Sequence, residues 1–227
     1  VSFDRPRGGE VDVLVVAGEH SGDQHAAKVV ADLLAARPGL RIAAFGGPRL
    51  RAAGAQLLFD MTTFSAVGIV EILSAYPFYR RLFNRMVDWT LQWKPKVVVL
   101  VDYPGLNLRL ANELRKAGLS RAGFGGTAVI QYVSPQLWAW KPKRRFTMAR
   151  DLDSVGTIFP FEPACYADTK LDARFVGHPF AEKEHIPGLR HDPDGPVLLL
   201  PGSRPKPVRK IFPALVEAFA LFRHTNV

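Results

Sequence analysis

The alternation of short apolar runs with amphipathic stretches constrains the fold of this chain more than any other feature. The apolar runs typical of strands are Val11–Val16, Arg41–Phe45, Val97–Val101, Thr127–Tyr132, Ser154–Ile158 and Ala173–Val176. Helical patterns begin between them, near Gly22, Glu71, Leu106, Lys143 and Glu162. Strands that alternate with helices predict a parallel α/β sheet. The run Val97–Val101 is apolar at every position, which is typical of an interior strand.

The composition changes after the last of these strands. Residues Glu182–Pro196 are rich in charge, proline and glycine, which is typical of a linker. A strand at Val197–Leu200 and an amphipathic helix over Val208–Phe222 are expected next. One strand and one helix do not bury each other's apolar faces. We therefore predict a Rossmann-like domain at residues 1–186, followed at 187–227 by the start of a second, incomplete one.

Composition narrows the functional classes. A hydrophobic content of 48% excludes whole-chain disorder. The single Cys165 excludes an internal disulfide and a cysteine-rich zinc site, as is usual in a reducing cytosol. We see no apolar run long enough for a bilayer and no signal peptide in residues 1–10, so we expect a cytoplasmic protein. The net charge of +9 suits nucleic acid, an anionic membrane or a phosphorylated substrate.

A polar turn follows the first expected strand and opens a helix. Its small residues allow a tight turn, and the helix start offers N–H groups to an anionic or hydroxylated ligand. Glu19, Ser21 and Asp23 add acceptors and a hydroxyl, which suit a sugar. The alternative is that Ser21 and Asp23 only cap this helix. His20 and His25 match no standard metal motif, so we expect no metal site there. We also expect no cofactor.

Asp102 follows the most apolar strand directly. Ligands of open parallel sheets bind beyond the carboxyl ends of the strands, so this carboxylate is expected to point toward a site. There it could take a proton from an attacking hydroxyl. The alternative is a carboxylate that caps the helix near Leu106.

Three further segments carry candidate contacts. Pro201-Gly-Ser-Arg204 could hold a diphosphate through backbone N–H groups, Ser203 and Arg204. The segment from Tyr132 to Arg145 combines two tryptophans with four basic residues; it could bind single-stranded nucleic acid, but we favour the wall of a cleft.

The third segment, Ala75–Trp93, is predicted to be a core-facing amphipathic helix or an interfacial surface. In the second case its aromatic and basic side chains would contact acyl chains or a membrane. These side chains are Phe78, Tyr79, Phe83, Arg80 and Arg81.

An ordered set of short segments resembles the lipid-A-disaccharide synthase family along nearly the whole chain. The segments are Ala17–Asp23, Gly46–Gly54, Val67–Leu73, Val101–Asn107, Tyr132–Arg145, Phe159–Pro163, Phe175–Pro179 and Leu200–Arg204. The resemblance implies a GT-B architecture, in which two Rossmann-like domains face each other across a cleft. It also implies metal-independent, inverting transfer from UDP-2,3-diacylglucosamine to 2,3-diacylglucosamine 1-phosphate, with release of UDP.

The resemblance assigns roles to the candidate residues. Asp102 would be the base. The substrate contacts would be Glu19, Ser21, Asp23, Asn107, Ser134, Trp138, Ser203 and Arg204. The protein would lie on the inner face of the cytoplasmic membrane, with anionic lipid but no nucleic acid as a partner, and it could form a homodimer. Two alternatives stay open: a non-catalytic fragment that binds lipid or sugar phosphate, and a basic α/β domain that binds nucleic acid.

Overall fold

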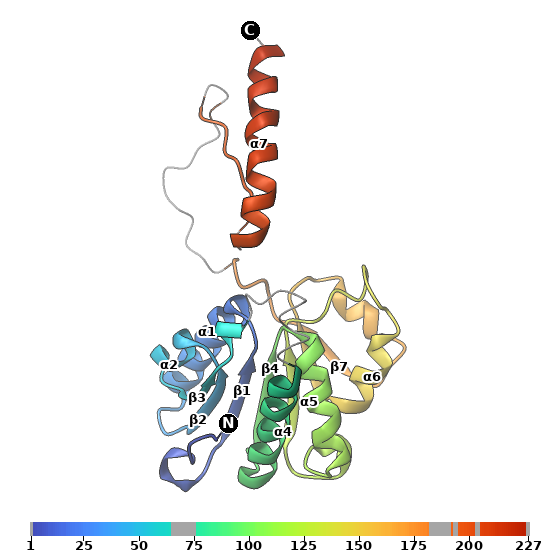
Figure 1. The fold of residues 1–227 in the computed structure, drawn as a ribbon. Helices are drawn as coiled ribbons and strands as arrows, with labels where there is room; N and C mark the ends of the chain where they lie inside the picture. The colour runs from blue at the N-terminus through green and yellow to red at the C-terminus, as the bar shows by residue number, and fades with distance from the viewer. Residues whose placement is uncertain (1, 65–75, 182–191, 193–194, 203–204, 226–227) are drawn as a thin grey trace. The chain divides into compact units, whose positions relative to one another are not determined.

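The computed structural model describes residues 2–64, 76–181, 192, 195–202 and 205–225 (Figure 1). The chain contains two compact units, Val1–Lys183 and Glu184–Val227. The first unit holds a sheet with helices. Among its described residues, the second holds one helix, α7 (Pro205–Thr225).

The first unit is built on a seven-stranded parallel sheet with the order β3-β2-β1-β4-β5-β6-β7. Its strands are β1 (Val13–Ala17), β2 (Ile42–Gly46), β3 (Gln56–Asp60), β4 (Val97–Val101), β5 (Ala128–Tyr132), β6 (Ser154–Thr157) and β7 (Asp172–Phe175). The parallel α/β class and six of the strands are confirmed. The edge strand β3 was not predicted, because its sequence lacks a clear alternation of apolar and polar residues. This agrees with its position at the edge, where all five residues are half-buried.

The helices connect consecutive strands. They are α1 (His20–Ala36), α2 (Pro48–Ala52), α4 (Tyr76–Trp93), α5 (Pro104–Lys116) and α6 (Arg144–Asp151). The short 3-10 helices are η1 (Arg7–Gly9), η2 (Thr62–Phe64), η3 (Arg121–Gly123) and η4 (Glu162–Tyr166). The helix expected near Glu162 is therefore only a 3-10 turn. The start expected near Glu71 lies outside the described residues.

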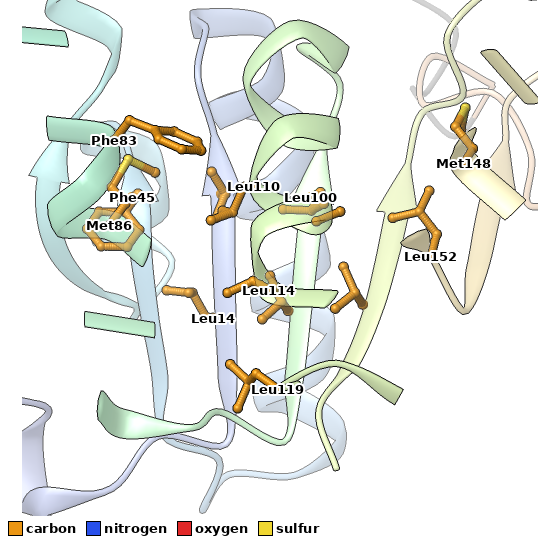
Figure 2. Close-up of a cluster of buried hydrophobic side chains, with 14 of the residues drawn as sticks. Leu14, Phe45, Phe83, Met86, Leu100, Leu110, Leu114, Leu119, Met148 and Leu152 are labelled. Atoms are coloured by element: carbon orange, nitrogen blue, oxygen red, sulfur yellow. The ribbon is translucent and has the colours of Figure 1, made fainter. Parts of the chain in front are cut away.

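The two faces of the sheet carry different helices. Crossovers between parallel strands are right-handed, so connections that run toward β3 and connections that run toward β7 lie on opposite faces. Accordingly, α1 contributes Ala26 and Val30 to one apolar cluster, which it shares with residues of β1 and β2. Helices α4 and α5 pack on another, where Phe83 and Met86 lie beside Phe45 (Figure 2).

The same topology leaves part of the α1 face without a helix. Side chains on that face of β4 and β5, such as Val97, Val99 and Ile130, are only half-buried. A cavity of about 810 Å³ lies there, between these strands and α1. The cavity lies along the sheet face, away from most of the loops that carry the candidate residues. We attribute it to the strand order, which leaves this face of β4 and β5 without a helix.

Ion pairs fasten the opposite, amino-terminal edge of the sheet. The Asp12 carboxylate accepts hydrogen bonds from Arg41 Nε (2.9 Å) and Arg41 Nη2 (3.1 Å) and lies 2.9 Å from Lys96 Nζ. Arg41 also pairs with Glu10 at 2.6 Å. Hydrogen bonds from Arg41 and then Lys96 hold the pKa of Asp12 well below its usual range. Asp12 thus joins the starts of β1, β2 and β4.

The second unit corrects one expectation. Residues Val197–Leu200 do not form a strand, although the sequence pattern predicts one. Val197, Leu198 and Leu200 are exposed, and a strand without a neighbouring strand gains no ladder hydrogen bonds. Helix α7 was expected and carries exposed apolar side chains, including Ile211 and Phe212.

Candidate functional site

The strand order changes direction between β1 and β4, and this point defines the candidate site. In open parallel sheets, ligands bind outside the carboxyl ends of the strands where the order reverses. Two loops meet there. The β1–α1 loop carries Gly18 and Glu19, and the β4–α5 loop carries Asp102 and Tyr103.

A pocket of about 270 Å³ opens at this point between α4 and α5. Its lining combines apolar side chains such as Leu82 and Met86 with Arg80 and Arg109. Gly18 and Tyr103 form the side nearest to the two loops. A Cβ atom on Gly18 would lie 2.5 Å from Cδ1 of Tyr103, so the glycine is required for the ring to lie across the end of β1. The pocket suits a ligand that is apolar over most of its surface.

The backbone at this edge is strained. Asp102 and Tyr103 have φ angles of +49° and +40°, and Val133 after β5 has a φ of +65°. Non-glycine residues seldom adopt this left-handed conformation, and a β-branched residue does so least. Such residues cost about 1–3 kcal/mol each and persist only where their surroundings hold them.

Two buried amide side chains hold these turns. Gln131 Nε2 donates to the carbonyl oxygens of Asp102 (3.0 Å) and Val133 (3.2 Å). Asn107 Nδ2 donates to the carbonyl oxygens of Val101 (3.1 Å) and Asp102 (2.7 Å). Both amide residues have no exposed surface. Asn107 is therefore a structural clamp on the β4–α5 turn, and its burial argues against the direct substrate contact expected from the sequence.

The Asp102 side chain is left available. Helix α5 has no side-chain cap, and no hydrogen bond or ion pair engages the Asp102 carboxylate among the described residues. The residue is partly exposed. The capping alternative is thus not observed, and the geometry offers an accessible carboxylate on a rigid turn.

Glu19 lies near enough to Tyr103 for its charge to act on the tyrosine hydroxyl. Burial, followed by the charge of Glu19 and the neighbouring Tyr79, raises the pKa of the Tyr103 hydroxyl above its usual value. This hydroxyl therefore remains a hydrogen-bond donor at neutral pH. Ser21 lies exposed in the first turn of α1. Two loops thus bring Glu19, Ser21 and Tyr103 to the same edge as Asp102.

Asp23 has a structural role that differs from both expectations. Its side chain is 1% exposed, and its oxygens accept hydrogen bonds from the backbone N–H groups of Gly47 (2.8 Å), Arg49 (3.0 Å) and Leu50 (3.2 Å). It caps the next helix, α2, instead of its own. Since its oxygens are occupied, Asp23 positions the β2–α2 turn beside the site.

Ser134 and Trp138 lie in the loop after β5. Ser134 is buried; its hydroxyl donates to the Pro135 carbonyl (2.9 Å) and lies 2.8 Å from the Tyr166 hydroxyl. Burial raises the pKa of Tyr166 to about 12. Ser134 is therefore committed to packing this loop, whereas Trp138 is exposed and meets Phe161 edge-on.

The α4 side chains divide between pocket and surface. Phe83 is only 6% exposed and lies in the core with Arg109 over its ring at 4.6 Å, so the expectation that it enters a membrane is wrong (Figure 2). The helical period turns Phe83 toward the sheet together with Met86. Arg80 and Arg81 are exposed, and Phe78 and Tyr79 are half-buried with their rings in contact.

Some of the expected contacts cannot be placed. Ser203 and Arg204 lie outside the described residues. Within the part of the chain that the structure describes, no three His, Cys, Asp or Glu side chains gather as metal ligands would. Among the described helices, none combines the length and hydropathy that crossing a bilayer requires.

Two site residues were not found from the sequence. Tyr103 stands in the Val101–Asn107 segment but had no role assigned. Gln131 is a single polar residue inside the apolar run that ends at Tyr132. A buried polar residue near the end of a strand needs a partner. That signal could have identified Gln131.

The comparisons with known proteins agree over most of the chain. The family model for lipid-A-disaccharide synthetase matches residues 13–226. The chain belongs to the lipid-A-disaccharide synthetase family. Residues 13–226 include every candidate site residue, from Gly18 and Glu19 to Asp102 and Arg204. The resemblance seen in the ordered segments is therefore confirmed.

Curated members of the lipid-A-disaccharide synthetase family are similar to this chain. It is 37% identical over 223 residues to lipid-A-disaccharide synthase 1 of Legionella pneumophila (strain Paris), which covers 94% of this chain and 56% of the relative. It is 41% identical over 215 residues to lipid-A-disaccharide synthase of Myxococcus xanthus (strain DK1622), covering 91% and 54%. The chain thus spans about half the length of these relatives.

A solved structure of Acinetobacter baumannii MurG aligns with 82% of this chain and 48% of its own length, at a TM-score of 0.43 and 12% identity.

Proposed function

We propose that this chain is the acceptor-side part of a glycosyltransferase of lipid A biosynthesis. The complete protein would join UDP-2,3-diacylglucosamine to 2,3-diacylglucosamine 1-phosphate and release UDP. The family match over residues 13–226 carries this proposal. The accessible Asp102 carboxylate at the switch point supports it, because sugar transfer needs a base where the acceptor hydroxyl would lie.

Asp102 acts as the general base in the proposed reaction. Its carboxylate takes the proton from the acceptor's 6-hydroxyl as that oxygen attacks the anomeric carbon of the donor. The bond between this carbon and the UDP oxygen breaks, and UDP leaves with the bonding electrons. Glu19, Ser21 and the protonated hydroxyl of Tyr103 offer hydrogen bonds that orient the acceptor sugar.

The pocket beside Tyr103 receives an acyl chain of the acceptor. Its apolar lining includes Leu82, Phe83 and Met86, and Arg80 and Arg109 add positive charge. An acylated sugar phosphate has the matching parts, namely an apolar chain and an anionic group. In this assignment Phe83 contacts an acyl chain within the pocket instead of a bilayer.

The second unit contributes to the donor side. Residues 187–227 would begin the domain that holds the UDP-sugar, with Ser203 and Arg204 facing its diphosphate. Two such domains would form the GT-B arrangement. The substrates place the protein in the cytoplasm, peripheral to the inner face of an anionic membrane, which fits the net charge of +9. A homodimer is compatible with this assignment.

The proposed function is tested by measuring acceptor binding and UDP release separately. The 227-residue chain should bind 2,3-diacylglucosamine 1-phosphate in detergent but should release no UDP when both substrates are present. The complete protein should release UDP in the same assay. The proposal that this chain binds the acceptor but does not transfer the sugar would be contradicted by either of two results. One is no acceptor binding by the chain, and the other is sustained UDP release by it.

A further inference from the structure

An exposed segment that runs from the loop after β5 into the first turn of α6 gathers aromatic and basic side chains. We name Trp138–Phe146 the aromatic–basic loop. Trp140 is 66% exposed, and Trp138 and Phe146 are about half exposed. Lys141 and Lys143 between them are also exposed. Large aromatic side chains this accessible mark an interaction surface when they cluster.

The positive charge of this loop is available to a partner. Arg145 is bound to the Asp168 carboxylate through Nε (2.7 Å) and Nη2 (2.6 Å), so it serves the fold. By contrast, Lys141 and Lys143 form no ion pair within the described ranges. The Lys141 ammonium lies 5.4 Å from the centre of the Trp140 ring.

The loop is held in one conformation. Leu137 is buried in the core at its start. The backbone N–H of Trp140 donates to the Gln136 carbonyl (3.0 Å), and the backbone N–H of Arg144 donates to the Lys141 carbonyl (2.9 Å). The Arg145–Asp168 pair closes the other end. A preorganised surface loses little conformational entropy when it binds.

We propose that the aromatic–basic loop is a contact surface for an anionic lipid bilayer. Tryptophan rings are favoured at the interface between headgroups and acyl chains, and nearby lysines are attracted to anionic headgroups. The loop follows β5, so it lies at the same edge of the sheet as the loops that carry Glu19 and Asp102 (Figure 1). Contact there would bring the candidate site next to the lipid surface.

Lipid fits this loop better than single-stranded nucleic acid. Nucleic acid binding of this type needs free ring faces on which bases stack. Here Lys141 covers one face of the Trp140 ring, and the Arg145 guanidinium, 4.3 Å from the centre of the Phe146 ring, covers one face of that ring, so fewer faces are open to bases. Insertion at a lipid interface does not need a free ring face. The choice of lipid also rests on the proposed function, in which the acceptor is an acylated sugar phosphate.

Sedimentation with vesicles tests this surface. The 227-residue chain is mixed with vesicles of phosphatidylglycerol and phosphatidylcholine in equal parts, or of phosphatidylcholine alone. We expect binding to the anionic vesicles that weakens with salt, because the Debye length falls from about 10 Å at 0.1 M to about 3 Å at 1 M. The double variant Lys141→Ala/Lys143→Ala should bind about 25-fold more weakly, at about five-fold for each lysine. Trp140→Ser should weaken binding about ten-fold.

Matched substitutions at the opposite edge of the sheet serve as the control. Phe124 and Arg121 are exposed beside η3, so Phe124→Ser/Arg121→Ala removes an aromatic ring and a charge away from the loop. This control should bind vesicles like the unchanged chain. Tryptophan fluorescence should also be quenched by brominated acyl chains, and the quenching should fall in Trp140→Phe.

Two results would overturn the assignment. One is unchanged vesicle binding by loop variants whose circular dichroism shows them to be folded. The other is binding of single-stranded RNA, lost in these variants, with no affinity for vesicles. The vesicles contain no substrate, and acceptor affinity is measured in detergent. Failure of the lipid surface is therefore distinguishable from failure of the proposed function.

Discussion

The two edges of the parallel sheet are built in different ways. At the amino-terminal edge, charged groups pair with one another: Asp12 binds Arg41 and Lys96, and Arg41 binds Glu10. At the carboxyl-terminal edge, the Asp102 carboxylate is unpaired among the described residues, and neutral amides hold the backbone of its turn, while the Asp23 carboxylate holds the neighbouring β2–α2 turn.

The difference separates charged groups that stabilise the sheet from a charged group that is available to a substrate. A charge that is bound in an ion pair stabilises the sheet but is not available to a substrate. Where uncharged amides hold the turn, the Asp102 carboxylate is left unpaired among the described residues while the strained turn aims it. Asp102, Tyr103 and Val133 adopt left-handed conformations at this second edge, whereas Lys94 and Phe124 do so at the amino-terminal edge. At the second edge the strained residues include the candidate base and its neighbour, which is where strain is expected to position a functional group.

The largest expected effect is at Asp102. In the complete protein, Asp102→Asn should lower turnover about 100- to 10,000-fold, because the amide cannot accept the proton. The midpoint of thermal unfolding should stay nearly unchanged, since the carboxylate has no bound partner among the described residues. Turnover is measured as UDP release. Near-normal turnover would show that Asp102 is not the base, so that the carboxyl-terminal edge would lose its assigned chemical role.

Gln131 should show that the carboxyl-terminal edge depends on neutral donors. Gln131→Glu keeps the shape but places a carboxylate against the carbonyl oxygens of Asp102 and Val133. We expect a loss of about 3 kcal/mol in the free energy of unfolding, measured by urea denaturation. The control is Gln136→Glu on the surface, which should change stability by less than about 0.5 kcal/mol. Equal effects of the two would refute the clamp.

Asp12 tests the amino-terminal edge and has a defined pH dependence. Asp12→Asn should cost about 1.5–3 kcal/mol at pH 7, because hydrogen bonds to charged groups are lost. The pKa of Asp12 is lower in the folded state than in the unfolded chain, so its contribution is present above about pH 4 and is lost as the pH falls.

Urea denaturation at a series of pH values should therefore show the two proteins converging in acid. Acceptor affinity should not change. The exposed pair Lys28–Asp32 supplies a control, and Asp32→Asn should have little effect. A difference that persists unchanged in acid would contradict the assignment to the Asp12 charge.

Gly18→Ala should have a small effect on stability and a separate effect on acceptor binding. In Gly18→Ala the new methyl group displaces the Tyr103 ring, which can swing outward because it is partly exposed. We expect a loss of about 1 kcal/mol in stability, at the low end for overpacking. Affinity for the acceptor in detergent should fall, since Tyr103 also lines the pocket. Unaltered affinity would place the acceptor elsewhere.

Local patterns predicted most of the sheet. Val97–Val101 was expected with the bounds that β4 has, because its apolar run reports burial directly. Two strands were misjudged for opposite reasons. Gln56–Asp60 pairs at the edge although its pattern is weak. Val197–Leu200 has a strong pattern but forms no strand. Strand formation depends on a neighbour, which a local pattern does not report.

The site was predictable where its residues follow strands and was not where contacts join separate loops. The placement of Asp102 and Glu19 at one edge was predictable because the carboxyl ends of parallel strands lie at the same edge of a sheet, and their roles stay predictions. Asp23 was misassigned because it caps a turn 24 residues away, at Gly47. A capping signature in sequence reports only its own helix. The roles of Asn107 and Ser134 were hidden in the same way, since each side chain bonds inside the protein.

The reach of Gln131 has a consequence for engineering. Its amide bonds to the carbonyl of Asp102 in one loop and of Val133 in the next, although it belongs to β5 itself. The two loops therefore depend on one side chain, Gln131, which belongs to neither of them, and they would have to be transferred to another protein together with it. A chimera that grafts Val101–Asn107 onto another scaffold would need a glutamine at the matching position of the adjacent strand to keep the turn's shape.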